Sequence, residues 1–289
     1  MRGFELIRPT RMQDALAALG GEDPTVRAMS GGTGLMLMMK SGVFQPSALV
    51  SLADVEDAST SIDRLDDGSL RIGAMCSLSA LETSAEVRAA APMMSDAMPR
   101  LSNRRVRNVA RVGGNLAHGD PHMDLPPVLA ALETRVEVTG PDGTREIPVA
   151  ELYSGYYETV LEPSELITAA LVPAQDGWIS TYTKITTRAA EDWPALGIAA
   201  ALRIRDGSIA QARVFVSAAT ERLSRAEATE ALLTGAPVDR DGLFAQAADA
   251  AADSLETVED AQGSATYKSA LLRITMRRTL ERLTTGATQ

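Results

Sequence analysis

Two short glycine-rich motifs constrain the fold of this chain more than any other feature of its sequence. Ser30-Gly31-Gly32-Thr33-Gly34 follows a predicted strand at Thr25–Met29, and Val112-Gly113-Gly114-Asn115-Leu116 repeats the same order of strand, Gly-Gly and polar residue some eighty residues later. Glycines allow positive φ values and let backbone N–H groups approach a ligand closely, as anion-binding turns require. Two such turns are able to hold the phosphates of one extended diphosphate. The alternative is that both are ordinary structural turns.

The first motif matches neither of the common phosphate-binding patterns. The dinucleotide pattern G-x-G-x-x-G, started at Gly32, would need a glycine where the chain has Leu37. The P-loop pattern is nearly met by Gly34 and Lys40-Ser41, but its second glycine is replaced by Met39. The residues therefore predict a phosphate-binding turn that belongs to neither of these nucleotide-binding folds.

Patterns elsewhere divide the chain into a mixed first region and a second region that begins near Pro173. In the first region, turn residues at Asp67-Gly68 and Pro141-Asp142-Gly143 predict two hairpins. In the second, three predicted strands precede a run of helices, an order typical of a separate α+β domain. The strands are expected at Ser180–Thr186, Gly197–Arg205 and Ser208–Ala218, and the helices at Arg222–Leu233, Asp241–Ser254 and Ala265–Leu283.

Charge and cysteine content exclude several classes of function. The chain has 38 acidic and 28 basic residues and a net charge of −10, which argues against broad binding to nucleic acids or anionic membranes. Cys76 is the only cysteine, so neither an intrachain disulfide nor a cysteine-ligated iron–sulfur cluster can form. A reducing, cytoplasmic location is therefore expected. Met1–Pro9 lacks the apolar stretch of a targeting segment, and the longest apolar runs, Leu35–Met39 and Ile198–Leu202, are too short to cross a bilayer.

The chain's only two histidines alternate with carboxylates just after the second glycine motif. His118, Asp120, His122 and Asp124 are competent ligands for zinc or manganese, so a metal-dependent hydrolase is an open alternative. Pro121 interrupts regular geometry here, and no H-E-x-x-H framework accompanies the four residues. An ordinary surface loop is the third interpretation.

An ordered series of motifs along nearly the whole chain resembles the FAD-binding medium subunit of the molybdenum hydroxylases, the xanthine dehydrogenase and carbon monoxide dehydrogenase group. Each motif is weak alone, and the order and spacing of the series carry the resemblance. The motifs are Gly31-Gly32-Thr33 with Met39-Lys40, Ile72-Gly73-Ala74, Val106-Arg107-Asn108, Val112-Gly113-Gly114-Asn115-Leu116, Pro121 with Asp124-Leu125, Glu165-Leu166-Ile167 with Val172-Pro173, Lys184 with Arg188 and Asp192, and Gly263-Ser264-Ala265 with Tyr267-Lys268 and Arg277-Arg278.

The resemblance implies an α+β fold with FAD as the cofactor. A two-subdomain FAD-binding domain of the vanillyl-alcohol oxidase (PCMH) type would span residues 1–176, with subdomains at about 1–54 and 55–176. A smaller α+β domain of the CO dehydrogenase flavoprotein type, with a three-stranded antiparallel sheet and helices, would span residues 177–289. The implied FAD contacts are Met29, Ser30, Gly31, Gly32, Thr33, Gly34, Leu35, Leu101, Arg111, Val112, Gly113, Gly114, Asn115, His118, Asp124, Ile167 and Lys184.

Some of these contacts have an implied role with a plainer alternative. Asp124 matches a position that binds the adenosine part of FAD, and otherwise would be the N-cap of the helix predicted after it. Lys184 matches a lysine near the isoalloxazine ring, where an ammonium stabilises the negative charge of reduced flavin, and otherwise is a strand lysine facing solvent. Ile167 matches an apolar residue near the ring, and Leu101 a position where some relatives stack an aromatic side chain. Arg111 is expected either to pair with a phosphate or to face solvent.

The resemblance also implies an electron-transfer function. FAD would take electrons from 2Fe-2S clusters of a small partner subunit and pass them to an external acceptor, while a large molybdopterin-binding subunit hydroxylates the substrate. A dimer of heterotrimers is the implied assembly. An autonomous flavin oxidase is a further alternative, beside the metal-dependent hydrolase. The sequence leaves open both the substrate and the acceptor, which is NAD, a quinone, oxygen or a carrier protein.

Overall fold

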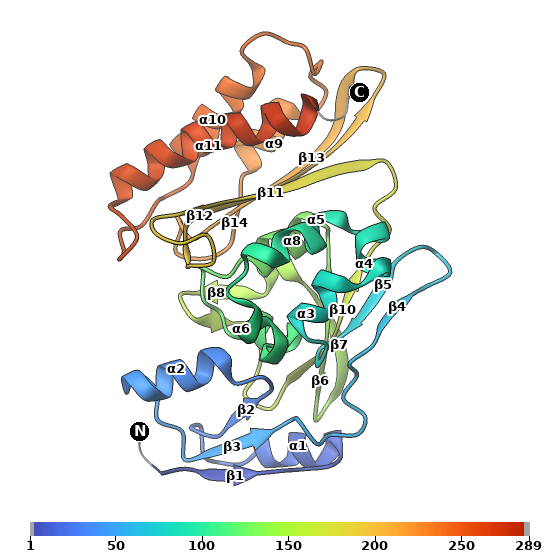
Figure 1. Cartoon of the computed structure of the whole chain (residues 1–289), viewed down its shortest axis with the longest axis vertical. Helices are drawn as coiled ribbons and strands as arrows, with labels where there is room; N and C mark the ends of the chain where they lie inside the picture. The colour runs from blue at the N-terminus through green and yellow to red at the C-terminus, as the bar shows by residue number, and fades with distance from the viewer. Residues whose placement is uncertain (1–2, 286–289) are drawn as a thin grey trace.

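The computed structural model describes residues 3–285 and shows three regions stacked along the long axis of the molecule (Figure 1). A small N-terminal unit lies at one end, a sheet with short helices lies in the middle, and a sheet backed by long helices lies at the other end. Three clusters of buried apolar side chains hold the molecule together. Within the described residues, no helix is long and apolar enough to cross a membrane.

The N-terminal region is a small α/β unit around a parallel sheet of order β1-β3-β2. The apolar face of helix α1 buries Ala15 and Leu19 in the same cluster as Val50 of β3. Strand β2 ends at Met29 and helix α2 begins at Thr33, so the first glycine motif is the turn between them. The elements are β1 (Glu5–Ile7), α1 (Met12–Leu19), β2 (Arg27–Met29), α2 (Thr33–Ser41) and β3 (Ala48–Ser51).

The middle region packs short helices onto an antiparallel sheet of order β4-β5-β10-β6-β7. Both predicted hairpins are confirmed, as β4–β5 and β6–β7. The strands are β4 (Ile62–Arg64), β5 (Leu70–Gly73), β6 (Arg135–Gly140), β7 (Gly143–Pro148), β8 (Tyr153–Gly155), β9 (Glu158–Thr159) and β10 (Leu166–Val172). The helices are α3 (Leu78–Thr83), α4 (Ala85–Ala90), α5 (Pro92–Ala97), α6 (Arg104–Val109), α7 (Val112–Ala117) and α8 (Leu125–Ala131), with short 3-10 turns at Met98–Arg100 and Val149–Glu151.

The C-terminal region is an antiparallel sheet of order β11-β12-β13-β14 that lies between helices (Figure 1). Successive side chains of a strand point to opposite faces, so the apolar run of β12 serves two cores. Ala199 belongs to the cluster of the middle region, whereas Ile198 and Ala200 belong to the C-terminal cluster. The elements are β11 (Trp178–Thr186), β12 (Pro194–Arg205), β13 (Ser208–Ser217), β14 (Ser224–Arg225), α9 (Glu227–Leu233), α10 (Leu243–Ser254) and α11 (Ala265–Thr285).

The structure confirms the mixed helix and strand fold but differs from the sequence expectations at three places. The predicted three-stranded sheet gains a fourth strand, β14, which is too short to show any periodicity. The helix predicted over Arg222–Leu233 begins only at Glu227, because Ser224 and Arg225 form β14 and pair with β13. The second glycine motif does not follow a strand: it forms helix α7, directly after helix α6.

Candidate functional site

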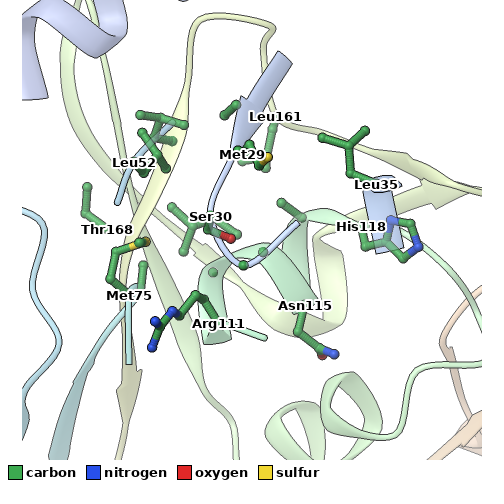
Figure 2. Close-up of a pocket in the computed structure, with 18 of the residues that line it drawn as sticks. Met29, Ser30, Leu35, Leu52, Met75, Arg111, Asn115, His118, Leu161 and Thr168 are labelled. Atoms are coloured by element: carbon green, nitrogen blue, oxygen red, sulfur yellow. The ribbon is translucent and has the colours of Figure 1, made fainter. Parts of the chain in front are cut away.

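A cavity of about 740 Å³ lies between the N-terminal and middle regions. Its volume is within the usual range for small-molecule and cofactor sites. Figure 2 shows the turn at Ser30 crossing the site, with Leu35 and His118 together on one side and Met75 and Thr168 on the other. The predicted residues that line it are Met29, Ser30, Gly31, Gly32, Thr33, Gly34, Leu35, Arg111, Gly113, Gly114, Asn115, His118 and Ile167.

The first glycine motif places the start of helix α2 in the cavity wall. Gly32 has φ 68°, a left-handed conformation in which a side chain would be strained. The first helical hydrogen bond runs from the N–H of Met36 to the carbonyl of Gly32, at 2.9 Å. The N–H groups of residues 33–35 therefore have no acceptor within the helix, and such a helix start attracts anions.

The second glycine motif offers fewer free backbone N–H groups to a ligand than the sequence suggested. The N–H of Val112 donates to the carbonyl of Cys76 at 3.0 Å, and that of Gly113 to the carbonyl of Ala74 at 2.8 Å. In the part of the chain that the structure describes, the N–H of Gly114 has no such acceptor. A Cβ on Gly114 would lie 2.2 Å from Ser30 Oγ, so any larger residue there would force the Ser30 hydroxyl to move where the two motifs touch.

Two polar side chains of the cavity wall have unused hydrogen-bonding capacity, Arg111 and Asn115. Over residues 3–285, the Arg111 guanidinium has neither a hydrogen-bond nor an ion-pair partner. The buried Asn115 Oδ1 also has no partner, although its Nδ2 lies 3.4 Å from Met123 Sδ. A buried polar atom without a partner is costly, and an arginine beside free backbone N–H groups is suited to a phosphate. These groups fit the pyrophosphate and hydroxyl groups of FAD.

His118 and Tyr157 form an aromatic part of the cavity wall. Their rings meet edge to face with centroids 5.3 Å apart, and a Cβ on Gly34 would lie 2.7 Å from His118 Nε2. Burial lowers the pKa of His118 below its ordinary value, although the charge of Asp120 opposes this. His118 is therefore neutral near pH 7 and does not add a positive charge to the phosphate site. Tyr157 was not among the residues expected from the sequence.

The sequence also missed a polar wall formed by strands of the middle sheet. Glu137 on β6 accepts hydrogen bonds from Arg71 Nη2 at 2.9 Å and from Thr168 Oγ1 at 2.8 Å. All three line the cavity. They come from three different strands, so no local motif could have revealed that they meet.

Four predicted contacts lie outside the cavity lining. Leu101 and Val112 are buried in the apolar cluster of the middle region, at 5% and 1% exposure. Asp124 and Lys184 form a buried ion pair of 2.9 Å. Asp124 also accepts a hydrogen bond from the Tyr182 hydroxyl at 2.7 Å, and Lys184 donates to the carbonyl of Arg100 at 2.8 Å.

The Asp124–Lys184 pair bears on the roles that the resemblance implied for its members. Since the two side chains touch, one extended FAD cannot place its adenosine end at Asp124 and its distant isoalloxazine ring at Lys184 in this arrangement. Of the alternatives, Asp124 does occupy the N-cap position of helix α8 but makes no side-chain capping bond, whereas Lys184 is buried rather than solvent-facing.

The structure contradicts the metal cluster considered from the sequence. His122 lies between two carboxylates, with Nδ1 2.8 Å from Asp120 Oδ1 and Nε2 2.7 Å from Asp260 Oδ2. Asp124 points instead to Lys184, and His118 packs on Tyr157. Among the described residues, no group of three His, Cys, Asp or Glu side chains is placed to hold a metal ion. Of the four residues only Asp120 and His122 meet, and the chain turns around them at Pro121 and at the positive φ of Gly119.

Two family profiles cover most of the chain. Residues 2–175 match the FAD binding domain in molybdopterin dehydrogenase, and residues 181–283 match the CO dehydrogenase flavoprotein C-terminal domain.

Curated relatives and solved structures agree with these profiles. The chain is 30% identical to the carbon monoxide dehydrogenase medium chain of Hydrogenophaga pseudoflava, over 96% of each chain. It is 31% identical to the nicotine 6-hydroxylase medium subunit of Paenarthrobacter nicotinovorans, over 94% of each. A solved structure of the carbon monoxide dehydrogenase from Hydrogenophaga pseudoflava superimposes with a TM-score of 0.93 and 31% identity, covering 98% of this chain and 97% of that one.

Proposed function

The chain belongs to the family of FAD-binding medium subunits of the molybdenum hydroxylases, its cofactor is FAD, and from this membership we propose that it carries electrons between subunits and an external acceptor. FAD supplies the redox chemistry, while the protein supplies its position and electrostatic surroundings. The chain cannot hold a cysteine-ligated cluster, since Cys76 is its only cysteine. We therefore place the electron-donating 2Fe-2S clusters in a small partner subunit and substrate hydroxylation in a large molybdopterin-binding subunit.

The observation that carries the proposal is the set of unpaired groups around the Ser30 turn. Free N–H groups at the start of α2, the Gly114 N–H and the Arg111 guanidinium converge on one cavity. Each charge-assisted hydrogen bond from such groups contributes about 1.5–3 kcal/mol to binding. We propose that the cavity-lining residues hold FAD, with the pyrophosphate at the Ser30 turn. Leu101, Val112, Asp124 and Lys184 do not line this cavity, and their contact with FAD stays a prediction.

The domain division and assembly are also proposals. We propose a FAD-binding domain at residues 1–176 and a C-terminal domain at residues 177–289, in a dimer of heterotrimers.

The single cysteine, whose thiol pKa burial raises to about 11, favours a reducing cytoplasmic location.

The first test is the visible spectrum of the purified full-length chain, with cofactor and metal analysis. The proposal predicts a yellow protein that releases one FAD per chain and contains no stoichiometric zinc or manganese. A colourless protein that cannot be loaded with FAD would contradict it.

The remaining alternative is an autonomous flavin oxidase, which would also be yellow. Affinity purification from the native organism separates the two functions. The proposal predicts that a molybdenum-containing large chain and an iron–sulfur small chain are recovered with this chain. Substrate oxidation by the isolated chain alone would favour the oxidase instead.

A further inference from the structure

Tyr157 is held in the cavity wall in an unfavourable backbone conformation. It lies at the tip of the β8–β9 hairpin and has φ 59°, which is rare for a bulky residue. Such a conformation costs about 1–3 kcal/mol and persists only where the surroundings enforce it. Residues of this kind gather at ligand-binding sites, and Tyr157 lines the cavity.

The loop after the second glycine motif enforces this conformation. The N–H of Tyr157 donates to the carbonyl of Gly119 at 3.0 Å, and burial together with the charge of Asp120 raises the pKa of its phenol. A Cβ on Gly119 would lie 2.9 Å from the carbonyl carbon of Tyr157, so the loop and hairpin tip are in close contact. Asp120 is itself fixed, because its Oδ1 accepts from the His122 N–H at 2.9 Å.

The Tyr157 ring is therefore a fixed, partly exposed aromatic surface on the cavity. It is 38% exposed and packs edge to face on His118. The other phenyl-type ring of the described lining, Phe44, has the Arg27 guanidinium 5.3 Å from its centroid. Planar ring systems bind well against an immobilised aromatic side chain, with a contribution of about 0.5–1.5 kcal/mol.

We propose that Tyr157 is a FAD-contacting residue whose aromatic ring packs against one of the two planar ring systems of the cofactor. The inference rests on the proposed placement of FAD in this cavity. The backbone hydrogen bond to Gly119 and the ring contact with His118 hold Tyr157 in place before FAD arrives, so little side-chain freedom is lost on binding.

The test compares FAD titrations of the apo full-length chain in the wild type, Tyr157→Leu, Tyr157→Phe and Tyr156→Leu. Tyr157→Leu is expected to raise the dissociation constant about 3- to 10-fold, whereas Tyr157→Phe keeps the ring and stays within about 3-fold. Tyr156 is the matched control on the same hairpin, since it is 51% exposed and does not line the cavity. Its leucine variant is expected to bind FAD like the wild type.

Two further probes identify the ring system that Tyr157 contacts. If it contacts the isoalloxazine ring, Tyr157→Leu also weakens FMN binding and reduces the quenching of flavin fluorescence. If it contacts adenine, FMN binding is unchanged and ADP becomes a weaker competitor.

An unchanged FAD affinity in Tyr157→Leu, in a chain with wild-type circular dichroism, would overturn the inference. If Tyr157→Leu does not fold, Tyr157→Met, which also removes the aromatic ring, is titrated in its place. An unchanged FAD affinity in Tyr157→Met would likewise overturn the inference. A wild-type chain that binds no FAD would instead remove the proposed function.

Discussion

Gly114 is the residue at which the two glycine motifs touch, and it has no room for a side chain. A Cβ there would overlap the Ser30 hydroxyl, and its own N–H is free in the described chain. We expect Gly114→Ala to raise the FAD dissociation constant about tenfold, equivalent to ~1.4 kcal/mol, because the Ser30 hydroxyl must rotate out of this contact and into the space that the phosphates need. Titration of the apo chain, followed by flavin fluorescence, measures this change.

Ser30→Ala provides the matched control for this substitution. It removes the oxygen that the new Cβ would meet and leaves Ser30 Cβ at 3.6 Å, an ordinary contact. The double variant Ser30→Ala/Gly114→Ala should therefore regain most of the lost affinity. Wild-type FAD affinity in Gly114→Ala alone would show that Gly114 does not belong to the phosphate site.

At the residue scale, local sequence was a good guide only where the site depends on backbone. The Ser30 turn could be predicted because glycine conformation is a local property. The Arg71–Glu137 pair carries no local signal, since the pairing of β5 and β6 with β10 brings it together, and Tyr157 is tied to the cavity by its hydrogen bond to Gly119 on a distant loop. The contact between Asp124 and Lys184, 60 residues apart, was equally invisible.

At the scale of elements, a buried charge network joins the cavity-side loop to the C-terminal region. The His122 ring lies between Asp120 on its own loop and Asp260 in the turn before helix α11. The fully buried Lys268 of α11 donates to Asp260 at 2.5 Å and to the carbonyl of Ala218 at 2.8 Å. When His122 is protonated, the positive charges of His122 and Lys268 balance the negative charges of the two aspartates, as buried charges require.

This network predicts a pH dependence of folding stability. Burial alone would lower the pKa of His122, but hydrogen bonds and charges from Asp120 and Asp260 raise it above 6.5. The contribution of protonated His122 to folding stability is therefore complete below about pH 6.5, and it is lost as the pH rises through the folded-state pKa of His122. Hydrogen bonding lowers the pKa of both carboxylates against the effect of burial, so their contribution is lost only as pH falls below about 3.8.

We expect His122→Asn to reduce the free energy of unfolding by about 1–3 kcal/mol at pH 5.5 and by less at pH 9. Urea unfolding of the full-length chain at the two pH values measures this difference. His118 is an internal comparison, because its pKa is shifted down whereas that of His122 is shifted up. An NMR titration in which both histidines change charge below pH 6.5 would contradict the assignment.

Elements with a strong pattern were predicted well, and short ones were not. The β4–β5 and β6–β7 hairpins have clear turn residues, and the long helices α10 and α11 have enough length to show their character. Helix α7 was missed because its Val-Gly-Gly-Asn sequence has poor helix propensity, and hydrogen bonds to Ala74 and Cys76 hold its start. Strand β14 exists only through its pairing with β13.

At the scale of the whole molecule, the chain resembles medium subunits of enzymes that are named for different substrates. It is about equally similar to medium subunits named for carbon monoxide and for nicotine, over nearly their full lengths. The cavity lies at the contact of the N-terminal and middle regions, while β12 joins the middle region to the C-terminal helices. This division is consistent with a subunit that holds a cofactor and leaves substrate recognition to another chain.

The most direct test follows electrons through the assembled complex. The complex purified with its partners, with and without FAD removed, is reduced anaerobically, freed of excess reductant and mixed with an electron acceptor. The account predicts that the FAD-containing complex is reoxidised rapidly, whereas without FAD the 2Fe-2S clusters stay reduced until FAD is restored. Equally fast cluster reoxidation in the absence of FAD would contradict the claim that electrons leave through this chain.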